Sequence, residues 1–462
     1  MLLEELKAIV GPGGWTCDPE ELKPHLTEWR NAFRGETRIM VSPSTTDEVS
    51  RVVSTCASAC VGIVPQGGNT GLCGGAIPDA TGDQVLLSTA RLNRIRSINP
   101  QNYSMVVEAG CILATIQDAA REHNRFFPLS LAAEGSCQIG GNLSTNAGGI
   151  NVIRYGTARR HVLGLEVVLA DGTIWDGLRS LRKDTAGYDM KQVFIGSEGT
   201  LGIITAASLR LYPDPGEMTT AFVALRSAHQ SVDLLAALRS SLADRIQAFE
   251  LISDRALRFV ARHIPGTRIP FDKEHSWYVL IDVAQGSDGG LLERELMRSI
   301  ENDLALDVIV AKSNTEADAL WRLRHSISEA QKREGASLKH DISVPVASIG
   351  EFLERAQSLV DKILPDARLC TFGHVGDGNL HYNVSQSKDG DIAQFKTRGA
   401  DLSNAIYDLV TEIGGSISAE HGIGILKKEC LVKHRSAAEL DLMQSLKRAL
   451  DPLNTLNPGK VI

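Results

Sequence analysis

The segment 374–381, His-Val-Gly-Asp-Gly-Asn-Leu-His, places two histidines around a turn sequence. Asp377-Gly378 suits a two-residue type I′ turn, which would pair His374 directly with His381 in a β-hairpin. Directly opposed residues have Cβ atoms roughly 4.5–5.5 Å apart, so both imidazoles could bind one metal ion. Asn383 would point to the same face, because side chains alternate along a strand.

Glu420-His421 adds a carboxylate and a third imidazole about forty residues later. His374, His381 and Glu420 offer a ligand set suited to a divalent metal ion, and His421 could then handle protons. A hairpin with two hydrogen-bonded histidines explains the same spacing. The residues alone leave both interpretations open.

The composition describes an ordinary globular protein. The chain has 462 residues, of which 43% are hydrophobic and 23% charged, enough for two or three domains. A net charge of −8 argues against a general binder of nucleic acids or anionic membranes. The sequence has no apolar run of about 18 residues, no secretory signal and no Cys-x-x-Cys motif. We therefore expect a reduced cytoplasmic protein.

Strands and helices are mixed without strict βαβ alternation, which favours an α+β fold. Thr45-x-x-Glu48 forms a capping box before a helical apolar pattern. The breakers in Tyr212-Pro-Asp-Pro-Gly216 mark the clearest boundary. We expect domains at 1–213, at 214–419 with the histidine hairpin, and at 420–462.

Three glycine-rich tracts could surround a long ligand with backbone N–H groups. The tract 65–75 holds five glycines in eleven residues, and glycine lets an anion approach the backbone. It matches neither the Rossmann fingerprint nor the P-loop, and a flexible loop is the alternative. The tracts 135–149 and 195–202, with Arg154-Tyr-Gly156 between them, favour the ligand-binding interpretation.

These tracts resemble the FAD-binding motifs of the vanillyl-alcohol-oxidase superfamily, most closely its D-2-hydroxy-acid dehydrogenase branch, over residues 38–462. The resemblance implies a two-subdomain FAD-binding domain of the PCMH type, an α+β substrate (cap) domain and a C-terminal helical segment that returns to the flavin. The residues that it places at FAD are Pro65, Gln66, Gly67, Gly68, Asn69, Thr70, Gly71, Leu72, Glu134, Gly135, Ser136, Gly140, Gly141, Asn142, Thr145, Asn146, Gly148, Gly149, Tyr155, Gly156, Glu198, Gly199, Gly202, Ile203, Ile204 and Asn457.

The resemblance also concerns how FAD is held. Some members of the superfamily attach FAD covalently through a histidine in the first glycine tract. This chain has Asn69 and no histidine in that stretch, so we expect non-covalent FAD. Asn457 would reach the isoalloxazine.

The histidine hairpin matches the same branch. The resemblance implies that His374, His381 and Glu420 hold a divalent ion, commonly Zn²⁺, and that His421 takes the proton of the substrate hydroxyl. Hydride would pass to N5 of FAD. The electrons would then leave to an external acceptor, an electron-transfer flavoprotein or a quinone.

A second polar group is predicted from Arg324, Ser328 and Lys339. Arg324 and Ser328 stand at i, i+4 in a helix expected over 316–333, so they would share a face. Solvated surface cations are the alternative for such residues. The resemblance instead implies that these three, with Asn383 and His421, bind a hydroxy dicarboxylate. His325, where members often have Glu, and Ser328, where Thr is more usual, depart from the pattern.

We therefore expect oxidation of D-2-hydroxyglutarate to 2-oxoglutarate, with D-malate as a second candidate substrate. Within the same superfamily the alternative is a D-lactate or glycolate dehydrogenase, and Lys339 with Arg324 discriminates between the two. An alternative of another class is a non-catalytic FAD-binding subunit. We also expect no membrane span, no nucleic acid partner and a homodimer.

Overall fold

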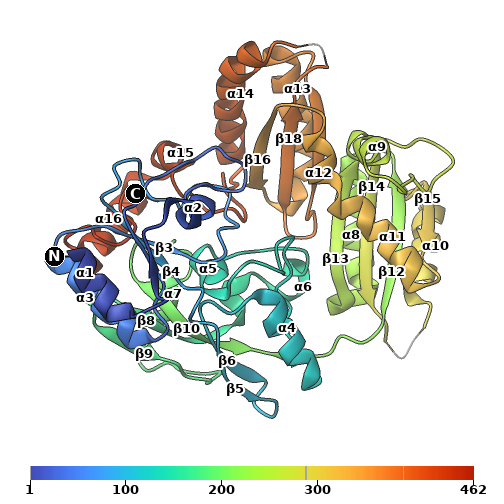
Figure 1. Ribbon diagram of the computed structural model, residues 1–462. Coiled ribbons are helices and arrows are strands. Elements are labelled where there is room, and N and C mark those ends of the chain that lie inside the picture. The colour runs from blue at the N-terminus through green and yellow to red at the C-terminus, as the bar shows by residue number, and fades with distance from the viewer. Residues whose placement is uncertain (1, 287–288, 389) are drawn as a thin grey trace. The chain divides into compact units, whose positions relative to one another are not determined.

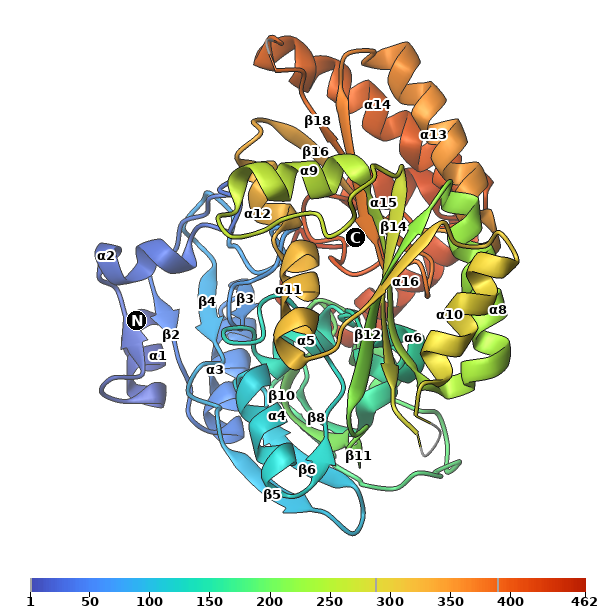
Figure 2. The same cartoon turned by 90° about the vertical axis from the view of Figure 1, so that its right-hand side faces the viewer.

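The computed structural model describes residues 2–286, 289–388 and 390–462, and the chain divides into two compact units (Figures 1 and 2). Unit 1 comprises residues 1–148, 156–214 and 420–462. Unit 2 comprises residues 149–155 and 215–419. Each unit is thus assembled from separate stretches of sequence.

Unit 1 contains a four-stranded sheet of order β1-β2-β4-β3 and a five-stranded sheet of order β5-β6-β10-β8-β9, and β7 pairs with β11. The strands are β1 (Trp15–Thr16), β2 (Met40–Val41), β3 (Ile63–Gln66), β4 (Val85–Ser88), β5 (Ile95–Asn99), β6 (Ser104–Glu108), β7 (Arg125–Phe126), β8 (Val162–Val168), β9 (Ile174–Gly177), β10 (Ile203–Arg210) and β11 (Tyr212–Pro213). The helices are α1 (Leu2–Val10), α2 (Pro19–Leu22), η1 (Lys23–His25), α3 (Thr46–Ser58), α4 (Leu113–Glu122), α5 (Ile139–Ser144), η2 (Ala158–His161), α7 (Lys191–Phe194), α15 (Lys428–His434) and α16 (Ala437–Leu450).

Helix α3 begins where the capping box predicts. The Thr45 hydroxyl accepts a hydrogen bond from the Glu48 N–H at 3.1 Å, and the Glu48 carboxylate accepts one from the Ser44 N–H at 2.6 Å. Val49, Val52 and other residues at helical spacing are buried in the core. The local pattern therefore determines this element.

Unit 2 is built on a seven-stranded sheet of order β15-β12-β14-β13-β17-β18-β16, in which all neighbours are antiparallel. The strands are β12 (Met218–Leu225), β13 (Ile246–Ser253), β14 (Trp277–Ala284), β15 (Asp307–Val310), β16 (Ser337–Ser343), β17 (Arg368–Gly373) and β18 (Asn379–Ser385). The helices are α6 (Val152–Tyr155), α8 (Ala228–Leu242), η3 (Ala243–Arg245), α9 (Asp254–His263), α10 (Leu291–Glu301), α11 (Asn314–His325), α12 (Ile327–Lys332), η4 (Val346–Ser348), α13 (Ile349–Ile363) and α14 (Ile392–Glu412).

The two faces of the β16-β18-β17 part of this sheet have different coverings. His340 and Tyr382 point towards α14 and α13, since His340 bonds Ser403 and Tyr382 packs on Phe352. Residues of α9, α11 and α12 pack on the opposite face, in one core cluster with Cys370 and Phe372 of β17. We call this opposite face the α12 face.

The single helix expected over 316–333 is two helices. The Ser326 N–H bonds the carbonyls of both Arg322 and Arg324, and α12 starts one residue later at Ile327. This tightened turn ends α11. Arg324 is buried, whereas Ser328 is exposed, so the predicted shared face is wrong.

The predicted pairing of the histidine hairpin is also wrong. His381 lies opposite Phe372, and His374 stands in a five-residue connection, 374–378. The Gly376 N–H donates to the Phe249 carbonyl at 3.4 Å, and the Gly378 carbonyl accepts from the Val344 N–H at 3.1 Å. These bonds to adjacent chain segments replace the expected pairing within the hairpin and widen the loop.

Candidate active site

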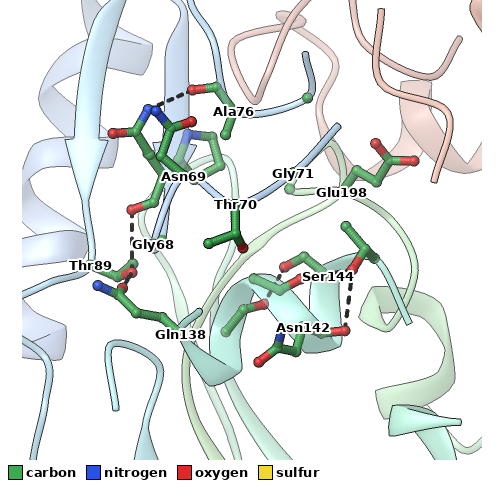
Figure 3. A pocket seen from close by; sticks show the side chains of 18 of the residues that line it. Gly68, Asn69, Thr70, Gly71, Ala76, Thr89, Gln138, Asn142, Ser144 and Glu198 are labelled. Carbon is green, nitrogen blue, oxygen red and sulfur yellow. Dashed lines mark hydrogen bonds between the residues drawn. The ribbon is translucent and has the colours of Figure 1, made fainter. Parts of the chain in front are cut away.

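Unit 1 contains a pocket, partly open to solvent, between the glycine-rich tracts (Figure 3). Of the residues expected at FAD, Pro65, Gln66, Gly67, Gly68, Asn69, Thr70, Gly71, Leu72, Gly140, Gly141, Asn142, Thr145, Glu198, Gly199, Gly202, Ile203 and Ile204 line it. Sequence reasoning missed Cys73, Gly75, Ala76, Thr89, Gln138 and Ser144, which line it too. Five of these six lie in or next to a glycine tract, and only Thr89 comes from elsewhere.

The glycines bring the tracts together and leave room between them. A Cβ on Gly68 would collide with the Ser136 carbonyl, and one on Gly199 would come within 2.5 Å of Pro65 Cγ. A Cβ on Gly71 or Gly141, by contrast, would meet no atom within 4 Å. The first pair is needed for close packing of the tracts, and the second pair faces open space.

The pocket also presents polar atoms to a ligand. The Asn142 side-chain oxygen is buried and has no hydrogen-bond partner among the described residues. Thr89 Oγ1 donates to Gln138 Oε1 at 2.7 Å, which fixes the wall beside the first tract (Figure 3). A long cofactor with ribityl hydroxyls and a pyrophosphate needs such open backbone and polar groups. The residues present therefore fit FAD.

Other residues expected at FAD do not line this pocket: Glu134, Gly135, Ser136, Asn146, Gly148, Gly149, Tyr155, Gly156 and Asn457. Some of them support the tracts. Asn146 Oδ1 accepts the Arg159 N–H at 3.0 Å, and Glu134 Oε1 accepts the Leu131 N–H at 3.0 Å. Gly149 and Tyr155 belong to unit 2.

The C-terminal tail returns to the pocket region. Leu456 forms a parallel bridge with Ile63 of β3. The Asn457 amide donates to the carbonyls of Gly75, at 2.9 Å, and Glu198, at 2.7 Å, and both of those residues line the pocket. The side-chain oxygen of Asn457 is buried, and no residue in the described part of the chain bonds it.

His421 lines the same pocket, and Glu198 anchors the loop that follows it. The Glu198 carboxylate accepts hydrogen bonds from the N–H groups of Ile423, at 2.7 Å, and Gly424, at 2.8 Å. Burial raises the pKa of Glu198 even though these N–H groups lower it. Glu420 also belongs to unit 1, where its carboxylate lies against Gly148: a Cβ there would come within 2.8 Å of Glu420 Oε1.

In unit 2, His374 and His381 are close together although they are not opposed in the hairpin. Their ring centroids are 5.7 Å apart, with an angle of 76° between the ring planes. His374 Nδ1 is 2.6 Å from Glu250 Oε1, and His381 Nδ1 is 4.0 Å from Asp341 Oδ1. A carboxylate behind a histidine is typical of metal ligands, because it sets the tautomer and the ring orientation. This arrangement fits a metal ion bound through Nε2 of His374.

Glu250 was not predicted, and it links His374 to Arg324. It is fully buried, accepts a hydrogen bond from Arg324 Nε at 2.8 Å and forms an ion pair with Arg324 Nη2, also at 2.8 Å. Burial raises the pKa of Glu250, but the opposite effect of His374 and Arg324 is larger and lowers the pKa to about 2. Its only signal in the sequence is one acidic residue in the apolar strand Ile246–Ser253.

Lys339 and Asn383 lie directly opposite each other on β16 and β18, on the same α12 face as His381. Both donate to the side-chain oxygen of Gln331, each at 2.9 Å. Gln331 is fully buried and was also missed by sequence reasoning. Unit 2 thus brings together Arg324, Lys339, Asn383 and the histidine pair, while Ser328 is exposed.

Comparison with known proteins places this site in a family. Residues 37–177 match the model described as an FAD binding domain, and residues 214–461 match the C-terminal domain of FAD linked oxidases. A mitochondrial D-2-hydroxyglutarate dehydrogenase of Arabidopsis thaliana is 37% identical over 99% of this chain and 80% of its own length. The chain belongs to the family of FAD linked oxidases that includes this D-2-hydroxyglutarate dehydrogenase.

Further members agree. The mitochondrial D-2-hydroxyglutarate dehydrogenase of Bos taurus is 38% identical over 100% of this chain and 83% of its own length. The D-2-hydroxyglutarate dehydrogenase of Xanthomonas citri pv. viticola is 38% identical, over 96% and 93%. The prediction of an FAD-dependent hydroxy-acid dehydrogenase is confirmed at the level of the family.

Solved structures confirm the fold of this family member. p-Cresol methylhydroxylase with substrate bound superposes with a TM-score of 0.77 at 16% identity, covering 100% of this chain and 96% of that one. Alkyldihydroxyacetonephosphate synthase gives 0.75 at 18%, covering 99% and 84%. The predicted α+β fold of the PCMH type is therefore correct.

The prediction of a cytoplasmic protein is wrong. The relatives from A. thaliana and B. taurus are named as mitochondrial proteins, which points to mitochondria instead. None of the helices in residues 2–286, 289–388 and 390–462 is long and apolar enough to cross a membrane.

Proposed function

We propose that this enzyme oxidises D-2-hydroxyglutarate to 2-oxoglutarate, with D-malate as a second substrate. The observation that carries the proposal is the order of groups on the α12 face of unit 2. His381 and Asn383 are two residues apart on β18, a separation of about 6.6 Å along the strand. Lys339 faces Asn383 across the strand pair. A hydroxy acid held at His381 would therefore present a second carboxylate, two methylene groups away, to Lys339.

The glycine tracts of unit 1 hold non-covalent FAD in this proposal. Gly71 and Gly141 leave the backbone open to the cofactor, and Asn142 offers a side-chain oxygen that no described residue bonds. FAD, when bound, accepts a hydride from the substrate carbon.

His374, His381 and Glu420 hold a divalent ion, with Zn²⁺ as the first candidate. Glu420 follows Ala419, the last residue of unit 2. Ser416 is tied to Ser343 of β16 by two backbone hydrogen bonds, of 2.8 and 3.0 Å, so only a short stretch of chain connects Glu420 to the strands of the histidine site. When bound, the ion polarises the substrate hydroxyl and lowers its pKa.

The remaining chemistry belongs to the side chains. His421, in the wall of the FAD pocket, takes the hydroxyl proton on an imidazole nitrogen, because a neutral histidine is a suitable base near neutral pH. Arg324, Lys339 and Asn383 bind the carboxylates. Glu250 holds Arg324 and His374 in place by hydrogen bonds to both.

Electrons leave to an external acceptor, an electron-transfer flavoprotein or a quinone. A Saccharomyces cerevisiae relative, 34% identical over 96% of this chain, is named as a D-2-hydroxyglutarate–pyruvate transhydrogenase, so pyruvate belongs in any acceptor screen. We also propose a homodimer, which light scattering of the holoenzyme would test.

An anaerobic bleaching screen tests the proposed function. The holoenzyme should be reduced by D-2-hydroxyglutarate and not by its L-enantiomer. EDTA should abolish the reaction, and Zn²⁺ or Mn²⁺ should restore it. Full activity after verified metal removal would refute the metal site. Failure of every hydroxy acid to bleach the flavin would favour a non-catalytic FAD-binding subunit.

Lys339→Ala distinguishes a dicarboxylate substrate from a monocarboxylate substrate. It should raise KM for D-2-hydroxyglutarate at least about tenfold, because it removes a hydrogen bond to a charged group, and should change D-lactate kinetics much less. Equal effects on both substrates would favour a D-lactate or glycolate dehydrogenase.

A further inference from the structure

We infer that Gln331 determines substrate specificity by holding Lys339 and Asn383 as a pair of donors for the distal carboxylate. This inference rests on the proposed function, because it takes Lys339 as the group that binds that carboxylate. Gln331 lies on α12, whereas Lys339 and Asn383 lie on β16 and β18. It is therefore a positioning residue contributed by a helix to a site on two strands.

The hydrogen bonds determine how the amide of Gln331 is oriented. Its oxygen accepts from Lys339 Nζ and from Asn383 Nδ2, each at 2.9 Å. Its nitrogen donates to the hydroxyl oxygen of Ser385 at 3.0 Å. Turning the amide over would direct its NH₂ group at an ammonium and at another NH₂ group, which are donors only. One orientation is therefore strongly preferred.

Burial makes this arrangement rigid. Gln331 and Ser385 are both 0% exposed, and Asn383 is 4% exposed. A buried amide that loses its partners cannot recover them from water, so each group holds the others in place. Lys339 and Asn383 are also fixed opposite each other by strand pairing. The helix and the strands together set the spacing of the two donors.

The neutrality of Gln331 matters as much as its geometry. A glutamine orients an ammonium group without adding a negative charge beside it. A glutamate at the same position would place a carboxylate at hydrogen-bonding distance from Lys339, where it would compete with the carboxylate of the substrate. The residue thus aligns the donors and leaves the anion to be supplied by the ligand.

The test uses the holoenzyme with Gln331→Glu and Gln331→Met. The first substitution adds the competing anion, and the second keeps the side-chain length but removes the hydrogen bonds. D-2-hydroxyglutarate is compared with D-2-hydroxyvalerate, which has the same chain length and lacks the distal carboxylate. Binding of 2-oxoglutarate, followed by the perturbation of the flavin spectrum, gives a readout that does not depend on turnover.

Gln331→Glu should raise KM for D-2-hydroxyglutarate and Kd for 2-oxoglutarate at least about tenfold, with Gln331→Met showing a smaller rise. The kcat/KM for D-2-hydroxyvalerate should stay within about twofold. Gln386→Glu serves as the control for an added charge, because Gln386 follows Ser385 in the chain and packs against Gly335. It should leave both substrates unchanged.

Several results would overturn the inference. Equal losses with both substrates, or unchanged constants in both variants, would show that Gln331 has no part in specificity. Loss of the fold or of FAD in both variants would show a purely structural role. Lys339→Ala, measured in parallel, isolates the proposed function: if it discriminates between the substrates and the Gln331 variants do not, only the role of Gln331 fails.

Discussion

Replacement of Glu250 by leucine should destabilise unit 2 strongly. Glu250 is fully buried, accepts a hydrogen bond from Arg324 Nε and forms an ion pair with its Nη2, both at 2.8 Å, and lies 2.6 Å from His374 Nδ1. Glu250→Leu removes the carboxylate and leaves the guanidinium of Arg324, which is 8% exposed, without this ion pair. It also takes the hydrogen-bond acceptor from His374.

Removing one partner of a buried ion pair costs about 3–5 kcal/mol, because the remaining charge stays out of water. For a unit of about 200 residues, each kcal/mol lowers Tm by roughly 2–4 °C. The expected decrease in Tm is therefore roughly 6–20 °C. Glu250→Gln, which keeps an oxygen as acceptor, should show a smaller decrease. Metal affinity should fall by about 10–100-fold, as expected when a carboxylate behind a ligating histidine is lost.

The assay is thermal unfolding of metal-free protein, followed by circular dichroism and by differential scanning calorimetry, with metal content measured separately after reconstitution. Asp282→Asn is the matched control. Asp282 accepts hydrogen bonds from Thr220, at 2.6 Å, and Trp321, at 2.9 Å, and forms no ion pair with any described residue, and burial raises its pKa to about 6. Its substitution should change Tm by only a few degrees. A Tm of Glu250→Leu within about 2 °C of the parent protein would refute the reasoning.

Three further predictions concern the cofactor and pH. Acid precipitation should leave all FAD in the supernatant, because Asn69 replaces the histidine that attaches the flavin in some relatives; flavin in the pellet would contradict this. Gly141→Val should weaken FAD binding while the apoprotein keeps its Tm, because the new Cβ meets no protein atom within 4 Å; an equal loss of Tm would show a packing role instead. The Glu334 pKa is lowered to about 2 although burial raises it, because His263 and Arg368 bond the carboxylate. Its stabilising effect should thus be complete above pH about 4.5 and be lost as the pH falls towards 2; a Glu334→Gln variant with an unchanged pH profile in that range would argue against it.

Local sequence predicted much of the fold. The capping box at Thr45 fixed the start of α3, and the apolar residues at helical spacing after it are buried as expected. Short-range hydrogen bonds and the burial of one face determine such an element, and both are visible in a few consecutive residues. The break between α11 and α12 was not predicted, because Ser326 is not a strong helix-breaking residue.

In the candidate site, too, some features follow from local sequence and others only from the tertiary structure. The sequence by itself determined which chemistry the chain carries: glycine tracts suited to a long phosphate-containing cofactor, a histidine pair with Glu420, and the cations Arg324 and Lys339. Composition and spacing within short segments are enough for that, because residue type sets what a group can bind.

Only the tertiary structure decided which of these groups meet. It placed His374 in a widened loop beside His381, and it put the buried Glu250 between His374 and Arg324. It also brought Gln331 from a helix to Lys339 and Asn383 on two strands. These contacts depend on the register of β17 with β18 and on which helix covers the sheet. Both are set by packing between segments distant in sequence, so no local pattern encodes them.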